Sequence, residues 1–369
     1  MAYAVPGPTN IFPYLDSDIR IMYARNPRKM PLARYALYGD VNKQIAYYTK
    51  INSNVGIKIP GSNKNHAIWA DGQDRPHGQH NKISHSFENL TLHRHLHNFP
   101  HGAIALANQP YDVISNNMLL MAQKAGTLRA LWAYLEINAA VTATTIPTST
   151  LSAATGDTDV SAGTTTDPKF LKALLYAAQY IHQHTNGVVN EQYLKVVMGP
   201  LVARKLAVSA EMRDYVKGSP DAMKVLSRGF SNARYGLPME YYGFELVVED
   251  TVIDTGNPGT TTLADVFSTD DIWVLARVDK NMGSGMEAAS PLEGENVFPT
   301  TFSCLSLFEG PFWSLTDSGK TEVRDGTYGM GSEIWVDTKN ERVEGAIRDN
   351  FTTKVTAGDS GFVFTDVLP

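Results

Sequence analysis

LKVVMGP (Leu194–Pro200) and YGLPMEYYGFELVVED (Tyr235–Asp250) are the two runs that decide the fold of this chain. The first run is apolar and β-branched up to Gly199, which predicts a strand. Pro200 lacks an amide hydrogen and suits the first turn of a helix, so a helix is expected to begin there. The second run predicts a returning strand. Strand, helix and strand in this order indicate an α/β scaffold, and the block carries no group of residues typical of catalysis.

The residues between the two strands predict one amphipathic helix. It is expected to end at Gly218-Ser219-Pro220, because glycine and proline interrupt the helical pattern there. Its buried stripe is expected to consist of Val202, Leu206, Ser209, Met212 and Tyr215.

Length and composition limit the class of protein. The chain has 369 residues, which suggests roughly two or three compact units. Cys304 is the only cysteine, so no internal disulfide can form. The first twenty residues lack the pattern of a signal peptide, and no run of eighteen apolar residues occurs. These features favour a cytoplasmic location and argue against membrane insertion.

The net charge of -6 is unevenly distributed along the chain. Residues 1–100 hold 12 Lys and Arg against 6 Asp and Glu, whereas residues 211–369 hold 13 against 26. The basic residues of the first part are interleaved with apolar ones and form no compact tract, which argues against sequence-specific DNA recognition. The opposed charges instead suggest that the front of one subunit lies on the back of another.

Residues 1–38 predict an extended arm. They are rich in apolar and aromatic side chains and show neither helical nor strand periodicity. Prolines interrupt the segment throughout, so it cannot fold a core of its own and must be buried on something else. A neighbouring subunit and the domain of the same chain are both open as its partner. The prolines are Pro6, Pro8, Pro13, Pro27 and Pro31.

A long hairpin and a long helix are expected next. β-like runs at Gln44–Ile51 and Ile83–Leu92 predict the hairpin. The helix is expected to begin at Pro110, and about twenty-eight residues at roughly 1.5 Å each would make it about 40 Å long. Because Gly126 interrupts the stripe, we favour a helix packed on a sheet over a coiled coil. The predicted stripe is Ile114, Met118, Met121, Ala125, Leu128, Trp132, Leu135 and Ala139.

A threonine-rich loop at Thr142–Thr166 marks a boundary, and a second domain is expected after it. Asp167-Pro168 is expected to cap and start a helix that ends at Asn186-Gly187. The apolar face of this helix is predicted as Phe170, Leu171, Leu174, Leu175, Ala178 and Ile181. Asp271–Val278 predicts a strand. The tail from Ser332 predicts alternating strands separated by Gly345 and Gly358, with the apolar positions Ile334, Val336, Val343, Phe351, Val355, Phe362 and Phe364.

Eight of the ten histidines lie between His66 and His101. His93, His95 and His97 alternate, so a strand would place all three on one face. Two of them could chelate zinc, and a complete site would need a further ligand. We favour an exposed hairpin whose histidines contact a neighbouring subunit, and a pH-responsive contact is a second interpretation. The further ligands considered for zinc are His85, Glu88 and His101.

Three short matches to catalytic or nucleotide-binding motifs fail. GDSG at Gly358–Gly361 resembles a serine-protease nucleophile segment, but only eight residues follow it. GKT at Gly319–Thr321 resembles the end of a phosphate loop, but Ser314 occupies the earlier glycine position. Gly283-Ser284-Gly285 lacks the third glycine of a dinucleotide site. No catalytic, cofactor-binding or metal-binding residue is predicted, and the protein is not expected to be an enzyme.

The order of arm, hairpin, spanning helix, mixed α/β domain and terminal strands resembles the tailed-phage major capsid proteins of the HK97-like fold. The resemblance covers most of the chain and rests on this order more than on one motif. The residues that carry it are WADGQDRP (Trp69–Pro76), the helix after Pro110, LKVVMGPLVARKLAVSAEMRDYVKG (Leu194–Gly218), YGLPMEYYGFELVVED, DIWVLARV (Asp271–Val278) and RVEGAIRDNFTTKV (Arg342–Val355).

The resemblance implies an α+β fold in four parts. These are an N-terminal arm at 1–38, an extended loop hairpin at 39–105, a peripheral domain with the long spine helix and β-strands at 106–166 and 330–369, and a mixed α/β axial domain at 167–329. The connection between Gly218 and Tyr235 is then expected nearest to the axis of a capsomer.

The implied function is structural. Such a protein self-assembles into hexamers and pentamers of an icosahedral shell that encloses double-stranded DNA, in a virion capsid assembled in the host bacterial cytoplasm. The expected partners are further copies of the chain, a portal, packaged DNA without sequence-specific binding and, as a further candidate, a decoration protein. Because the chain starts directly with the arm, a separate scaffolding protein or a cleaved precursor is expected, and Met1 favours the separate scaffolding protein. No cofactor and no membrane are implied.

Two other interpretations stay open. An encapsulin-like bacterial compartment of the same fold would enclose cargo proteins in place of DNA. A metal-dependent enzyme built on the histidine cluster would contain stoichiometric metal and would lose activity when His93 or His95 is replaced by Ala.

Overall fold

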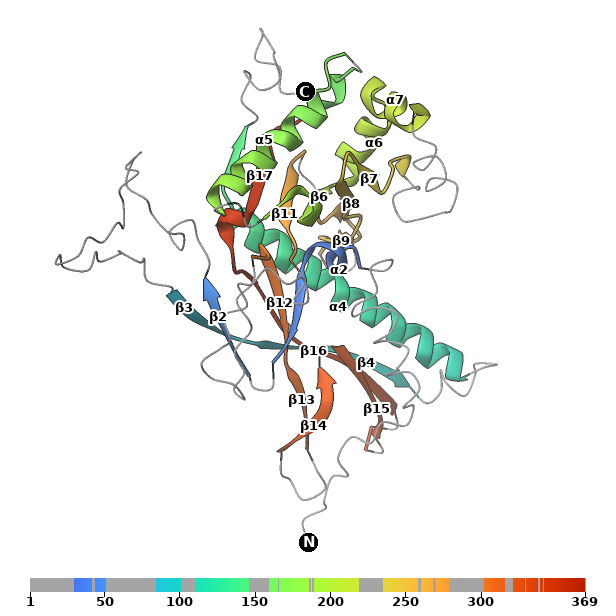
Figure 1. The fold of residues 1–369 in the computed structure, drawn as a ribbon. Helices are drawn as coiled ribbons and strands as arrows, with labels where there is room; N and C mark the ends of the chain where they lie inside the picture. The colour runs from blue at the N-terminus through green and yellow to red at the C-terminus, as the bar shows by residue number, and fades with distance from the viewer. Residues whose placement is uncertain are drawn as a thin grey trace, which may run out of the picture.

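The structure is a computed structural model, shown as a ribbon in Figure 1. It describes residues 30–41, 44–50, 84–100, 110–145, 159–164, 166–185, 187, 189–218, 235–257, 260–267, 270–278, 302–315, 321–328, 330–337, 339–340 and 342–368. The predictions that concern the arm up to residue 29, the segment Trp69–Pro76 and residues 219–234 lie outside the described residues.

A six-stranded sheet with strand order β5-β17-β11-β6-β8-β7 forms the upper part of the molecule in Figure 1. Its centre is the predicted strand–helix–strand block, because β6 and β8 pair in parallel and the intervening chain forms helices. The apolar runs therefore become buried central strands, as parallel pairing requires. The strands are β5 (Ala143–Thr145), β6 (Leu194–Met198), β7 (Glu240–Tyr241), β8 (Phe244–Val248), β11 (Ile272–Ala276) and β17 (Gly361–Thr365).

The single helix predicted after Pro200 is wrong, because the chain forms two helices, α6 (Pro200–Val208) and α7 (Ala210–Gly218). Ser209 has an extended backbone between them, with ψ of 149°. Its hydroxyl donates to the Leu206 carbonyl at 2.7 Å and accepts from the Met212 amide at 3.2 Å. Ser209 thus ends one helix and caps the next, a role that serine favours over the helix interior.

A five-stranded sheet forms the lower part of the molecule. Its central strand is β16, which pairs antiparallel with β4 along one edge and with β12 and β15 along the other. β1 pairs in parallel with β12. The strands are β1 (Leu37–Asp40), β4 (Thr91–Pro100), β12 (Leu305–Glu309), β15 (Met330–Asp337) and β16 (Arg342–Val355).

The long helix is confirmed as α4 (Pro110–Ala140), which packs on the sheet and crosses the molecule in Figure 1. Its buried line differs from the predicted stripe near the C-terminal end. Leu135 is 58% exposed, whereas Arg129 and Ile137 are fully buried. The predicted stripe alternated steps of three and four residues, which is a repeat of 3.5 residues per turn. A straight α-helix has 3.6 residues per turn, so the buried face moves away from that stripe over the length of the helix.

Gly345 lies inside β16 and does not separate two strands, so that prediction is wrong. A Cβ atom at this position would lie 2.5 Å from the sulfur of Met118 and 3.2 Å from the ring of Phe99. The missing side chain is therefore what allows α4 to approach the sheet closely.

The predicted hairpin is present as β2 (Ile45–Lys50) paired antiparallel with β3 (Ser84–Asn89). The helix predicted after Asp167-Pro168 is α5 (Lys169–His184). Glu211 of α7, and not Asp167, caps it, because the Glu211 carboxylate accepts the Phe170 and Leu171 amides at 3.1 and 2.9 Å. A cap supplied from a distant helix leaves no signal in the local sequence.

The other described elements are short or stand apart from the two sheets. They are α2 (Leu32–Tyr35), η3 (Val160–Ala162), η4 (Glu191–Tyr193), η6 (Gly358–Ser360) and the two-stranded pairs β9 (Val252–Asp254) with β10 (Leu263–Asp265) and β13 (Pro311–Leu315) with β14 (Thr321–Tyr328).

Two strands lie in a different sheet from the other strands of their predicted domain. β12 lies within 167–329 but pairs with β16 in the lower sheet. β17 lies within 330–369 but pairs with β11 in the upper sheet. One core cluster accordingly contains residues of both sheets, with Trp273 and Val363 from the upper sheet and Leu305 and Phe351 from the lower one.

A buried ion-pair network joins α4 to the lower sheet. The Arg129 guanidinium donates to Asp349 at 2.7 and 2.5 Å and to Glu309 at 2.7 Å. All three side chains are at most 1% exposed. Since β12 supplies Glu309 and β16 supplies Asp349, one side chain fixes the helix against two strands.

We predict that Arg129→Met lowers the free energy of unfolding by about 3–5 kcal/mol, because it leaves two buried carboxylates without their cation. Urea titration of the unassembled chain measures this. The matched control is Lys124→Met at an exposed position of the same helix, which should change stability by less than about 0.5 kcal/mol. Adding Glu309→Gln and Asp349→Asn to Arg129→Met should restore most of the loss. Equal stabilities of Arg129→Met and wild type would contradict the role of the network.

Candidate functional site

The described part of the chain contains no arrangement typical of an enzyme. No group of three or more His, Cys, Asp or Glu side chains within it could hold a metal ion. The GDSG match forms η6, where the Ser360 hydroxyl is buried and donates to the Ala357 carbonyl at 2.6 Å. That serine stabilises a turn and is not exposed as a nucleophile. No helix among the described residues is long and apolar enough to cross a membrane.

His93 lies on the inner face of β4, toward α4. Its ring packs edge-on against Trp132 at 5.3 Å between centroids, and it lies tilted at 34° to the ring of Phe351 at 5.0 Å. Burial lowers the pKa of both His93 and His95, although the charge of Asp349 opposes this. The prediction that the histidine face contacts a neighbour is therefore wrong for His93. The side chains of His85, His97 and His101 lie outside the described residues.

The β2–β3 hairpin exposes an aromatic pair, formed by Tyr47 and Phe87. The two residues are direct cross-strand partners with ring centroids 6.3 Å apart. Tyr47 is 45% exposed and Phe87 is 63% exposed. On the other face of β2, Tyr48 stacks on Phe308 at 5.5 Å, so that face holds the hairpin to the body. The exposed pair is a surface that burial against a partner would stabilise.

Two leucines extend the exposed apolar surface along β4. Leu92 is 46% exposed and Leu96 is 52% exposed, and they alternate with the inward-facing histidines. Arg94, between them, lies over the Trp335 ring at 5.2 Å. The signal for this surface was already present in the sequence, since apolar and imidazole side chains alternate in β4, but the sequence did not show which face α4 covers.

Residues 30–41, here called the arm anchor, attach the N-terminal segment to the upper sheet. Arg34 of α2 donates to Glu245 at 3.0 and 2.9 Å and to the Leu246 carbonyl at 2.9 Å. Arg277 donates to the carbonyls of Ala33 and Arg34 at 2.7 and 3.0 Å. The start of the described chain is therefore held by charged hydrogen bonds, which are stronger than neutral ones.

Two carboxylates under the arm anchor differ in ionisation. Partial burial opposes ionisation of Glu245, but hydrogen bonds and charges from Lys195 and Arg34 hold its pKa below the usual range. Burial raises the pKa of Glu249 to about 7, although hydrogen bonds from Thr251 and Tyr35 oppose the rise. The Tyr35 hydroxyl donates to Glu249 at 2.8 Å. The anchor therefore rests on one ionised and one partly protonated carboxyl group near neutral pH.

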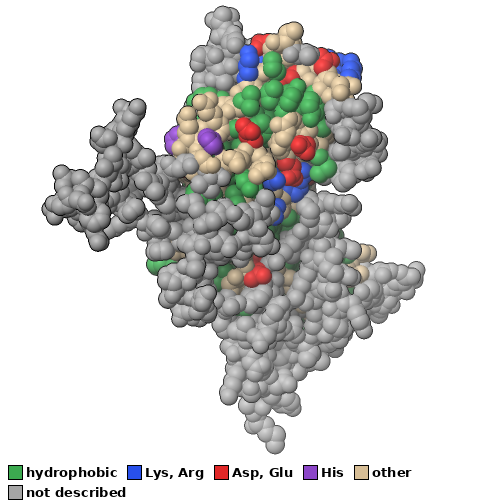
Figure 2. All heavy atoms as spheres, viewed as in Figure 1, with side chains coloured by type: hydrophobic (Ala, Val, Ile, Leu, Met, Phe, Trp, Pro, Cys, Tyr) green, Lys and Arg blue, Asp and Glu red, His purple; other side chains and the backbone are tan. Residues whose placement is uncertain are grey.

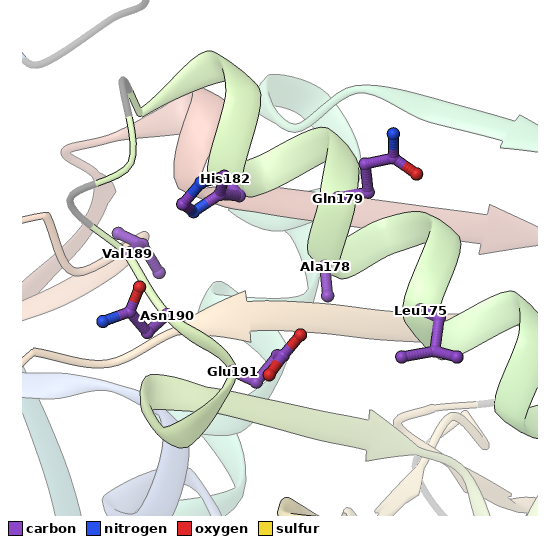
Figure 3. A pocket seen from close by; sticks show the side chains of 7 residues that line it. All are labelled: Leu175, Ala178, Gln179, His182, Val189, Asn190 and Glu191. Carbon is purple, nitrogen blue, oxygen red and sulfur yellow. The ribbon is translucent and has the colours of Figure 1, made fainter.

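A cavity of about 360 Å³ lies between α5 and the segment that precedes β6 (Figure 3). Its lining is mixed in polarity, and His182 and Glu191 extend from separate elements toward it. It is an open groove with no nucleophile in its described lining. The residues are Leu175, Ala178, Gln179, His182, Val189, Asn190 and Glu191.

Charged side chains are intermixed on the visible face of the molecule. Figure 2 shows acidic, basic and apolar side chains interspersed over the described part of that face. Within the described part of this face, no single basic patch is visible.

The comparisons with known proteins identify a fold. No family model matches the chain, and no curated protein matches it. A crystal structure of a phage-related protein from Bordetella bronchiseptica RB50 is similar over 98% of this chain and 99% of that chain, with a TM-score of 0.52 and 12% sequence identity. This likeness shows a shared fold, and the HK97-like fold expected from the sequence is confirmed.

Two further structures have lower scores. The mature capsid of bacteriophage PhiM1 is similar over 90% of this chain and 86% of that chain, with a TM-score of 0.49 and 12% identity. A virus-like particle from Pyrococcus furiosus is similar over 95% of this chain and 97% of that chain, with a TM-score of 0.45 and 9% identity.

We predict that Glu249 makes the unassembled chain less stable as pH rises. The folded chain retains a proton on Glu249 up to about pH 7, whereas an unfolded glutamate releases it near pH 4.3. The stability that this group contributes is therefore fully present below about pH 4.3 and is lost as the pH rises from there to about 7, by up to about 4 kcal/mol.

Urea titrations of wild type and Glu249→Gln at pH values from 5 to 8 measure this effect. The stability difference between the two chains should change with pH over this window, and Glu240→Gln, at an exposed position of β7, should show no such change. A constant difference between wild type and Glu249→Gln would contradict the raised pKa.

Proposed function

We propose that this chain is the major capsid protein of a tailed phage and that its function is structural. The observation that carries the proposal is the fold shared along almost the whole of both chains with a phage-related protein. A shell protein acts through surfaces that meet copies of itself, and this agrees with the absence of a catalytic arrangement in the described part of the chain.

The exposed hairpin supports self-assembly on physical grounds. Tyr47 and Phe87 place two aromatic rings side by side in solvent, while the opposite face of the hairpin is already packed on the body. Burying a side chain of this size contributes about 1.5–3 kcal/mol. In the proposed shell, the body of a neighbouring copy covers the aromatic pair.

The finer organisation follows the family resemblance. The upper sheet with α5, α6 and α7 would be the axial domain, and α4 with the lower sheet would be the peripheral domain. Hexamers and pentamers of the chain would form an icosahedral shell around double-stranded DNA, in a virion capsid assembled in the host cytoplasm. A separate scaffolding protein, a portal and a decoration protein would be its partners.

We predict that Phe87→Ser leaves the fold intact and raises the chain concentration needed for particle formation by about tenfold or more, since it removes a large apolar contact at each interface. Negative-stain images and sedimentation of the chain, expressed alone and with its scaffolding protein, measure particle formation. The control is Leu120→Gln, at an α4 side chain that is 63% exposed. Particles from Phe87→Ser at the wild-type concentration would count against the hairpin as an interface.

The content of the particles distinguishes the phage capsid from an encapsulin-like compartment. Nuclease-protected DNA of uniform length in particles from infected cells supports the capsid. Particles that hold one specific protein and no DNA would overturn it in favour of a compartment.

A further inference from the structure

The solvent face of α6 carries a stripe that is apolar at both ends and basic in the middle. Leu201 is 49% exposed and Val208 is 69% exposed. Arg204 and Lys205, which lie between them, are exposed as well. Spacings of three, four and seven residues place these side chains on one face of the helix, and the opposite face is buried in the core of the upper sheet. These four residues are here called the α6 stripe.

The two cations of the α6 stripe have no ionic partner within the described part of the chain. The Arg204 guanidinium lies over the Tyr235 ring, 6.0 Å from its centroid. Neither Arg204 nor Lys205 forms an ion pair or a side-chain hydrogen bond with another described residue. A surface that offers carboxylates between apolar side chains would therefore complement the stripe.

The β9–β10 pair has a face with this complementary pattern. Val252 is the direct cross-strand partner of Asp265, and Asp254 is the direct partner of Leu263. Cross-strand partners point to the same side of a sheet, as do residues two apart along a strand, so all four side chains lie on one face. Val252 is 47% exposed and Leu263 is 69% exposed. These four residues are here called the ribbon face.

Both carboxylates of the ribbon face are available to a cation. Asp254 is exposed, and its Oδ1 accepts the Gly256 and Thr262 amides at 2.9 and 2.8 Å. These backbone hydrogen bonds lower the pKa of Asp254, and no described residue donates to its Oδ2. The partly exposed Asp265 carboxylate has no hydrogen-bond or ion-pair partner among the described residues.

We propose that the α6 stripe of one copy of the chain binds the ribbon face of a neighbouring copy. This proposal rests on the proposed function, because it requires copies to meet. Each surface has two charged and two exposed apolar side chains, and the charges of the two surfaces are opposite in sign. The stripe is about 10 Å long and the ribbon face extends about 7 Å along its strands, so the two surfaces are similar in size.

The contact joins two different surfaces of the same chain. Both surfaces are exposed within one chain, so they do not cover each other there. In Figure 1, α6 lies at the upper right and β9 lies below it. Each copy can use one surface toward each of two neighbours, and such a contact can close into a ring. Opposite charges would set the register of the two copies, and burial of the apolar side chains would add stability.

Charge reversal in the full chain tests the proposal, by the concentration at which particles form. Lys205→Glu on the α6 stripe and Asp265→Lys on the ribbon face each bring like charges together in the contact. Each should raise that concentration about tenfold or more. The chain with both substitutions again has opposite charges and should assemble within about threefold of the wild-type concentration. The matched control is Lys124→Glu at an exposed position of α4, which should assemble like wild type.

Thermal unfolding of the unassembled chains separates assembly from folding. The variants should unfold close to the wild-type temperature, because none of the substituted side chains is buried. Impaired assembly by each single reversal, with recovery in the double variant, supports the proposal.

Three results would overturn the proposal and leave the proposed function intact. They are wild-type assembly by either single reversal, no recovery in the double variant, and an equal loss of assembly with Lys124→Glu. A wild-type chain that forms no particles would overturn the proposed function and this proposal together.

Discussion

The Arg129 guanidinium, buried between Asp349 and Glu309, is the interaction on which the rest of the structure depends. It joins the middle of α4 to two strands of the lower sheet at hydrogen-bond distances. A buried ion pair contributes little net stability compared with an apolar replacement, but it tolerates very few relative positions of its members. It therefore fixes the position of α4 along the sheet. The C-terminal half of α4, with Ala133 and Ile137, then packs in a cluster that also contains Trp273 of the upper sheet.

The two attachments of the N-terminal third to this body differ in chemistry. The arm anchor is held by charged hydrogen bonds, through Arg34 and Arg277, on the upper sheet. The hairpin is held by apolar packing of Tyr48 on Phe308 and exposes aromatic side chains on its other face. Directional hydrogen bonds fix the orientation of the arm anchor on the upper sheet. The exposed apolar face of the hairpin would be stabilised by burial against another surface. The hairpin therefore has one face that holds it to the body and one apolar face that is exposed.

Much of the fold could be predicted from the sequence, because strong periodic signals coincide with long elements. The run before Pro200, the helix after Pro110 and the strand at Asp271–Val278 form as expected. The failures occur where tertiary contacts overrule a local signal. Ser209 ends one helix and starts another, Glu211 replaces Asp167 as the cap of α5, and Gly345 remains inside a strand because Met118 lies against it. The buried Arg129 and the inward turn of His93 could not be predicted, because both depend on which sheet face α4 covers.

The central claim is that this chain acts by assembling with copies of itself, and its surfaces are its functional site. The measurement that tests this most directly is the mass of the purified full-length wild-type chain, alone and with its scaffolding protein, by sedimentation velocity over a range of salt and protein concentrations. We predict closed particles of megadalton mass in which the aromatic pair of the hairpin is covered by a neighbouring copy. A chain that stays monomeric under all of these conditions would contradict the account.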